Sequence, residues 1–68
     1  MNPNKYTLIV ATIKDDTEQW AEKFIFDDHL TEDECKQTLD GIITFFNETL
    51  SPNELPRTLV SFTYEHKP

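Results

Sequence analysis

The stretch that most constrains the fold is residues 6–13 (YTLIVATI), which carry no charge, no glycine and no proline. β-Branched and aromatic residues dominate this stretch, which favours a strand. Its two alternating sets of side chains are both apolar, with Leu8 and Val10 in one set and Ile9 and Ile13 in the other. A strand that is apolar on both sides belongs in the middle of a sheet. The sequence therefore predicts a central strand over residues 6–13.

A polar segment without glycine, residues 14–18, follows this strand and predicts a loop of several residues rather than a tight two-residue turn. Residues 19–26 then alternate as a second strand. Trp20, Phe24 and Phe26 share one side with Glu22, and Ile25 points to the other. The two strands are predicted to form a β-hairpin.

A capping box predicts where a helix begins. Thr31 is the expected N-cap, and Glu34 lies three residues on, where its carboxylate can reach back to the N-cap N–H. Leu30 and Cys35 occupy the positions of a hydrophobic staple. Apolar residues then recur at helical spacing: Leu39, Ile42, Ile43, Phe46 and Leu50. Because Pro52 ends this run, the predicted helix covers residues 31–50.

Residues 57–64 predict a third strand, with Val60 and Phe62 on one side, Leu59 on the other, and a frayed tail over residues 65–68. This strand could pair with the second strand through a right-handed crossover, or with the first strand in a fully antiparallel sheet of order 2-1-3. The apolar character of the first strand on both sides favours the second arrangement. We therefore expect one α+β domain over residues 1–68, a ββαβ fold with one helix packed on one face of the sheet.

Charge is the most informative functional feature of the sequence. The 68 residues include 13 acidic and 6 basic side chains, for a net charge of -7. A chain this acidic is repelled by nucleic-acid phosphates and by anionic membranes, so neither is an expected partner. The acids gather between residues 15 and 34, and we expect two clusters about 26 Å apart, at the two ends of the second strand. The predicted partner-binding residues are Asp15, Asp16, Glu18, Glu22, Asp27, Asp28, Glu32 and Asp33.

Two interpretations of these acids remain open. They can be ordinary solvated residues, those in the first helical turn favoured by the helix dipole. Alternatively they face a partner with a basic surface. One version of the second interpretation is a nucleic-acid mimic, of the kind made by phages and mobile elements, that blocks a nucleic-acid-binding site of a host defence protein.

A second functional signal comes from the number of apolar faces. One helix covers only one face of a three-stranded sheet. Apolar residues of the first strand must then lie on the uncovered face, where a protein partner or a second copy of the chain can dock. A homodimer is the simplest form of such association.

Signs of catalysis are few. The single glycine, Gly41, lies inside the predicted helix, so no glycine-rich phosphate loop is expected. Cys35 and His29 flank the helix start and could form a reactive thiol, but Cys35 fits a buried position better. His29 with nearby aspartates could hold a divalent ion, although the spacing of an EF-hand is lacking. Arg57 is expected to pair with Glu54 or with carbonyls at the helix end.

We therefore expect a non-enzymatic interaction protein (a regulator, inhibitor or subunit) with no cofactor and no metal. The nucleic-acid mimic is the first alternative, and a small-ligand-binding protein, which would need a cleft, is the second. A single cysteine, the lack of an apolar run of about 20 residues and the lack of a signal-peptide pattern predict a cytoplasmic location.

Overall fold

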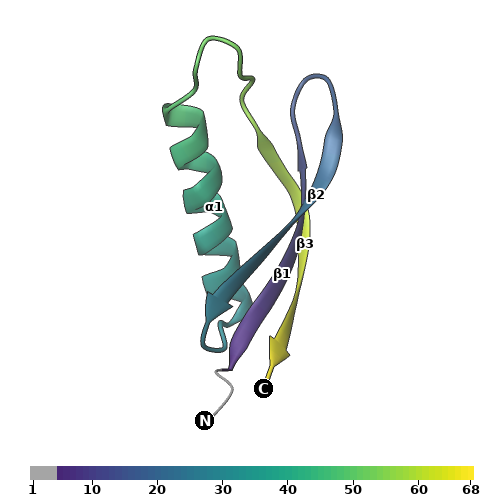
Figure 1. The fold of residues 1–68 in the computed structure, drawn as a ribbon, viewed down its shortest axis with the longest axis vertical. Helices are drawn as coiled ribbons and strands as arrows, with labels where there is room; N and C mark the ends of the chain where they lie inside the picture. Colours follow the sequence, from purple (N-terminus) through teal and green to yellow (C-terminus); the bar gives the residue numbers. More distant parts are fainter. Residues whose placement is uncertain (1–4) are drawn as a thin grey trace.

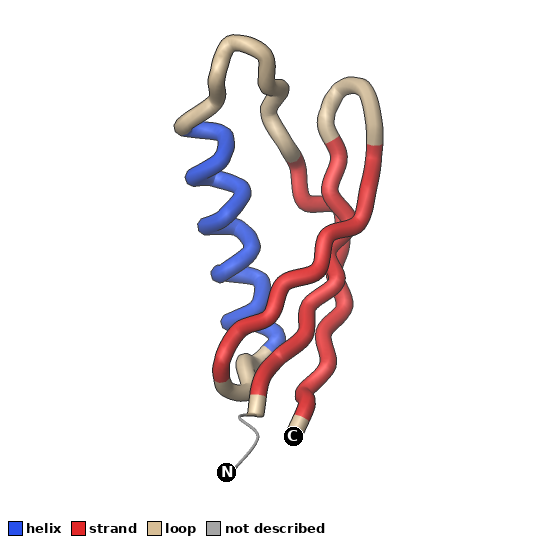
Figure 2. The backbone as a smooth tube through the Cα atoms, in the orientation of Figure 1, coloured by secondary structure: helices blue, strands red, loops and turns tan. Residues whose placement is uncertain are grey.

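The computed structural model describes residues 5–68. The chain forms β1 (Tyr6–Lys14), β2 (Gln19–Asp27), α1 (Glu32–Glu48) and β3 (Thr58–Lys67), in that order (Figure 1). Both strand pairings are antiparallel, the sheet order is β2-β1-β3, and α1 runs along one face of the sheet (Figure 2). The predicted α+β fold of order 2-1-3 is confirmed, and pairing of the third strand with the second is excluded.

The core lies between β1 and α1. Alternate residues of β1 are buried and the residues between them are half-buried. Ile9, Ala11 and Ile13 form one cluster with Cys35 and Leu39 of α1, and each of these five is at most 1% exposed. β1 has a strand on each side and apolar residues on both faces, so the central position predicted for the first strand is confirmed.

The molecule is elongated. Its principal extents are 45 × 21 × 19 Å and its radius of gyration is 13.5 Å, against about 11 Å for a typical domain of this length. The β1–β2 loop and the α1–β3 loop lie together at one end, and the β2–α1 connection lies at the other (Figure 1). The fold therefore keeps the two regions rich in acidic residues at opposite ends.

A β-bulge changes the predicted face assignment of β3. Thr12 pairs with Ser61 and Ile13 pairs with Leu59, so Val60 is an extra residue in the ladder. Leu59 and Phe62 consequently both pack on the core, while Val60 is 47% exposed. The prediction that Val60 shares a side with Phe62, opposite Leu59, is wrong because the bulge reverses the alternation.

The predicted frayed tail is also wrong, since β3 continues to Lys67 and residues 65–67 pair with the first residues of β1. Two histidines secure this end. The His29 Nε2 lies 2.8 Å from the Lys67 carbonyl oxygen and the His66 Nε2 lies 2.7 Å from the Leu30 carbonyl oxygen. Their rings stack with centroids 4.4 Å apart. Contacts between residues far apart in the sequence thus order a segment that local sequence predicts to be loose.

The capping box is confirmed. The Glu34 N–H donates to the Thr31 hydroxyl oxygen at 3.1 Å, and the Thr31 N–H donates to the Glu34 carboxylate at 2.8 Å. The helix ends at Glu48 with Thr49 as C-cap, which is earlier than the predicted end at residue 50. No helix within residues 5–68 is long and apolar enough to cross a membrane.

Replacing Thr31 by alanine is expected to lower the free energy of unfolding by about 1 kcal/mol, because the Glu34 N–H loses its acceptor. The matched control is Thr31→Ser, which keeps the hydroxyl and should stay close to the wild type. Urea melts of the three proteins measure the difference. Equal stability of the alanine and serine variants would show that the cap does not hold the helix start.

Candidate interaction surfaces

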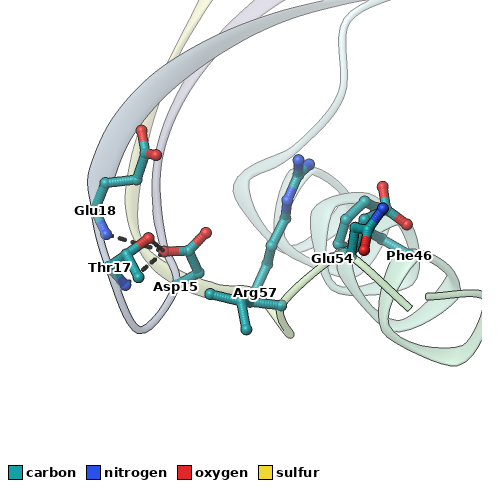
Figure 3. Close-up of a pocket in the computed structure, with 8 residues that line it drawn as sticks. Asp15, Thr17, Glu18, Phe46, Glu54 and Arg57 are labelled. Carbon is teal, nitrogen blue, oxygen red and sulfur yellow. Dashed lines mark hydrogen bonds between the residues drawn. The ribbon is translucent and has the colours of Figure 1, made fainter. Parts of the chain in front are cut away.

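Asp15 shapes the β1–β2 loop. Its Oδ1 accepts hydrogen bonds from the Thr17 N–H at 2.8 Å, the Thr17 hydroxyl at 2.9 Å and the Glu18 N–H at 2.9 Å (Figure 3). These backbone bonds, Thr17 first and then Glu18, hold the pKa of Asp15 below its ordinary value of 3.8. The ionised carboxylate therefore stabilises the loop above pH 3.8, and this effect is lost as the pH falls through the lower folded-state pKa. Asp15 is a loop-forming residue, whereas Asp16 and Glu18 are exposed.

The second acidic cluster surrounds the β2–α1 connection, where Asp27, Asp28, Glu32 and Asp33 are all exposed. Asp28 has a φ of 73°, a left-handed conformation that aspartate and asparagine tolerate better than most residues. Its N–H donates to the Lys5 carbonyl oxygen at 3.1 Å. Glu32 and Asp33 lie in the first turn of α1, where the helix dipole favours negative charge. Much of this cluster therefore also has a structural role.

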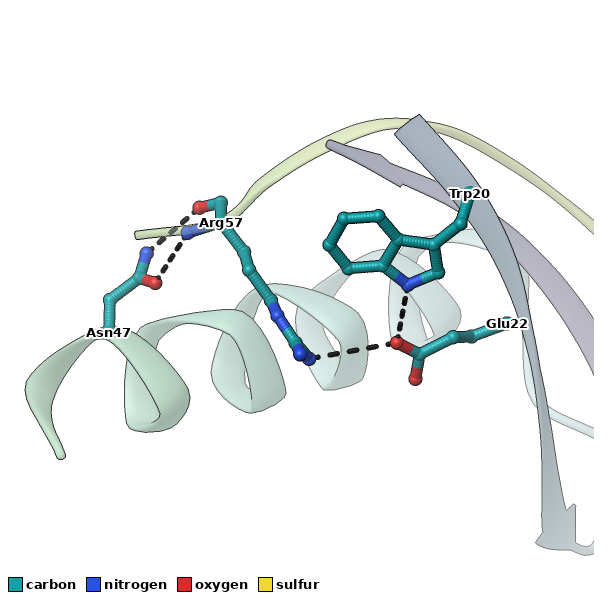
Figure 4. Close-up of polar contacts among 4 residues, drawn as sticks. All are labelled: Trp20, Glu22, Asn47 and Arg57. Carbon is teal, nitrogen blue, oxygen red and sulfur yellow. Dashed lines mark hydrogen bonds and ion pairs between the residues drawn. The ribbon is translucent and has the colours of Figure 1, made fainter. Parts of the chain in front are cut away.

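Glu22 belongs to neither cluster. It lies in the middle of β2 on the side facing α1 and is half-buried. Its Oε2 accepts a 2.7 Å hydrogen bond from the Trp20 indole N–H and lies 3.6 Å from the Arg57 guanidinium (Figure 4). The structure thus places this predicted partner-binding residue in an internal polar contact.

Arg57 links the end of α1 to the sheet. Its guanidinium carbon lies 3.8 Å from the ring centroid of Phe46 and 5.0 Å from that of Trp20, within the range of cation–π contacts. The Asn47 side chain holds the Arg57 main chain, donating to its carbonyl oxygen at 2.9 Å and accepting from its N–H at 2.8 Å (Figure 4). The ion pair of Arg57 is with Glu22, not with Glu54 as the sequence suggested. The sequence carries no spacing signal for this cluster.

An open recess lies between the β1–β2 loop and the α1–β3 loop (Figure 3). It has a volume of about 290 Å³ and is lined by Asp15, Thr17, Glu18, Phe46, Asn53, Glu54, Leu55 and Arg57. A neighbouring recess of about 310 Å³ shares Asp15, Glu18 and Arg57. Small-molecule sites are mostly lined by apolar residues, whereas most of these side chains are polar. The recess gives little support to the interpretation as a small-ligand-binding protein.

The residues considered for thiol or metal chemistry have structural roles. Cys35 is buried, and burial, followed by the charges of Glu34 and Glu32, raises the pKa of its thiol. A raised pKa opposes formation of the reactive thiolate. His29 stacks on His66. Within residues 5–68, no group of three or more His, Cys, Asp or Glu side chains is arranged to hold a metal ion.

The face of the sheet opposite α1 is the remaining surface, and we call it the open face. Directly paired residues point to the same side of a sheet, so the register places Tyr6, Leu8 and Val10 of β1 on this face, with Ile25 beside Leu8. Ile25 is 66% exposed. The charged residues on this face are Lys14, Lys23, Asp27, Glu65 and Lys67. Three lysines against two acids make the open face nearly neutral on a chain whose net charge is -7.

The sequence predicts both an uncovered apolar face and contact residues among the acids. The signal for the open face was the apolar character of both sides of residues 6–13.

No family model, no curated protein and no solved structure matches this chain.

Proposed function

We propose that this chain is a small, acidic, non-enzymatic module that binds a protein partner through the open face of its sheet. The observation that carries the proposal is the apolar stripe of Tyr6, Leu8, Val10 and Ile25, which lies on the face opposite α1. Surface apolar residues that gather in one patch, rather than singly, are typical of interaction sites.

The charges around the stripe suit a protein contact. Lys23 pairs with Val10 on one side, and Glu65 pairs with Leu8 on the other, so an apolar centre has charged residues of both signs at its edges. Protein interfaces have this arrangement of apolar core and polar rim. Covering an exposed isoleucine completely is worth about 1.5–3 kcal/mol. Of the apolar side chains on the open face, Ile25, at 66% exposed, therefore has the most to gain from a partner.

The nucleic-acid mimic is the second candidate. What favours it is the elongated shape, 45 Å long, with exposed acids at both ends. Charge density argues against it, because a duplex of that length carries about 26 phosphate charges at one per 1.7 Å, whereas the net charge here is -7. Asp15 and Glu22 are moreover engaged within the molecule.

A photo-cross-linking amino acid placed in the chain, in cells that naturally make it, tests the proposal. Position 25 probes the open face, and position 45 is a matched control on α1, since Ile25 is 66% and Phe45 is 68% exposed. Position 18 probes the acidic loop. We expect one protein to cross-link from position 25 and not from position 45. Cross-linking from position 18 alone would favour the mimic and contradict docking on the open face.

A further inference from the structure

β3 is an edge strand without charge along most of its length. Residues 58–64 (TLVSFTY) carry no charged side chain, and β3 pairs with β1 on one side only. The opposite edge strand, β2, has Glu22 and Lys23 at its middle. Charged residues are the usual means of keeping an edge strand from pairing with another chain. β2 is thus protected, whereas the outer backbone groups of β3 are available to a further strand.

We propose that β3 pairs with β3 of a second copy of this chain, in antiparallel orientation about a two-fold axis. Identical strands suit each other in this orientation, because every contact occurs twice and the interface closes with two copies. The two three-stranded sheets then form one continuous sheet of six strands. The axis is perpendicular to the sheet, so both copies of α1 lie on the same side.

The bulge and the charges select the register. Pairing must use residues beyond Val60, where the ladder with β1 is regular, and the charge-free part of that region is 61–64. Its centre places the axis beside Phe62 or Thr63. An axis at Phe62 would limit the regular pairing to residues 61–63, because Tyr64 would then face the bulged Val60 of the second copy. An axis at Thr63 extends the regular pairing to residues 61–65 and pairs Phe62 with Tyr64 of the second copy, twice.

The area of the open face also favours pairing through β3. This reason rests on the proposed function, in which a partner docks on that face. Strands of nine, nine and ten residues present a face of roughly 14 × 30 Å, or about 420 Å². A standard protein interface buries about 800 Å² on each partner. Pairing through β3 joins two open faces side by side and supplies about that area, whereas a single copy supplies half of it.

Sedimentation equilibrium of the protein without a partner tests the pairing. At tens of micromolar we expect a mass twice that of the 8.0 kDa chain. Thr63→Lys should weaken dimerisation at least about tenfold, since it sets two lysines opposite each other. The matched control is Ala21→Lys, on the same face of β2 at the other edge, and it should dimerise like the wild type. A wild-type monomer throughout the range, or equal loss in both variants, would overturn the inference.

Disulfide cross-linking tests the register directly. Cysteines at position 63 would have Cα atoms about 4.5–5.5 Å apart across the axis, within the range of a disulfide. Cysteines at position 61 would be about 14 Å apart and should remain unlinked. Cys35 does not interfere because it is buried. We expect Thr63→Cys, and not Ser61→Cys, to form a covalent dimer on mild oxidation, and the reverse result would contradict the register.

Ile25→Lys separates this inference from the proposed function, because Ile25 lies on β2, away from the β3 edge. A dimer that survives Ile25→Lys and is lost in Thr63→Lys supports pairing through β3. A dimer lost only in Ile25→Lys would mean that two open faces pack together, which overturns the inference. A monomeric chain that still cross-links a partner from position 25 would overturn the dimer and leave the proposed function standing.

Discussion

Replacing Leu39 by alanine is expected to lower the free energy of unfolding by about 3 kcal/mol. Leu39 is 1% exposed and is the residue through which the middle of α1 enters the core beside Ile9 and Ile13. A chain of 68 residues has a total stability of roughly 3–10 kcal/mol, so this one change removes a third of it or more. Urea melts followed by circular dichroism measure the loss.

Phe45→Ala is the matched control on the same helix. Phe45 is 68% exposed, so its truncation should change the free energy of unfolding by no more than about 0.5 kcal/mol, as is usual for surface sites. Similar losses in the two variants would mean that α1 packs on the sheet with a different face from the one described.

The second large effect is expected at Thr7, whose side chain is fully buried. Its hydroxyl donates to the Asp28 carbonyl oxygen at 2.8 Å and accepts from the Leu30 N–H at 2.8 Å. Valine has the same shape without the hydroxyl, so Thr7→Val leaves both main-chain groups without a partner. We expect a loss of about 2–3 kcal/mol, since each unsatisfied buried group costs about 1–3 kcal/mol.

Thr7→Ser provides the control, because it keeps the hydroxyl and removes only a methyl group, worth about 1 kcal/mol. Amide hydrogen exchange at Leu30 adds a local measurement, and its protection should fall in the valine variant and persist in the serine variant. A valine variant more stable than the serine variant would show that the hydroxyl does not hold the β2–α1 connection.

The features predicted from sequence depend on residues close together in the chain. The capping box needs only Thr31 and Glu34, and both of its hydrogen bonds are present. The central place of β1 follows from apolar residues at every second position in both alternating sets. Given a central first strand, the order β2-β1-β3 is the arrangement that gives it a neighbour on each side.

The features that were missed depend on contacts between distant segments. The bulge at Val60 arises in the ladder between β1 and β3, and nothing within β3 marks it. Arg57 meets Trp20 and Glu22 only because the hairpin and the end of α1 come together. A residue type alone likewise does not show that Glu22 forms an internal contact while Ile25 remains exposed, because both depend on how the strands pair and where α1 lies.

The affinity of the cross-linked partner for two variants tests the role of the open face most directly. Ile25→Lys changes that face. Asp16→Asn with Glu18→Gln removes two of the three charges of the acidic loop while leaving the Asp15 hydrogen bonds in place. We predict that Ile25→Lys raises the Kd at least about tenfold, as loss of a central apolar contact does, and that the loop variant binds like the wild type at low and high salt. The contrary result has three parts: Ile25→Lys leaves the Kd unchanged, wild-type binding weakens as salt rises, and the loop variant binds poorly. That result would contradict docking on the open face.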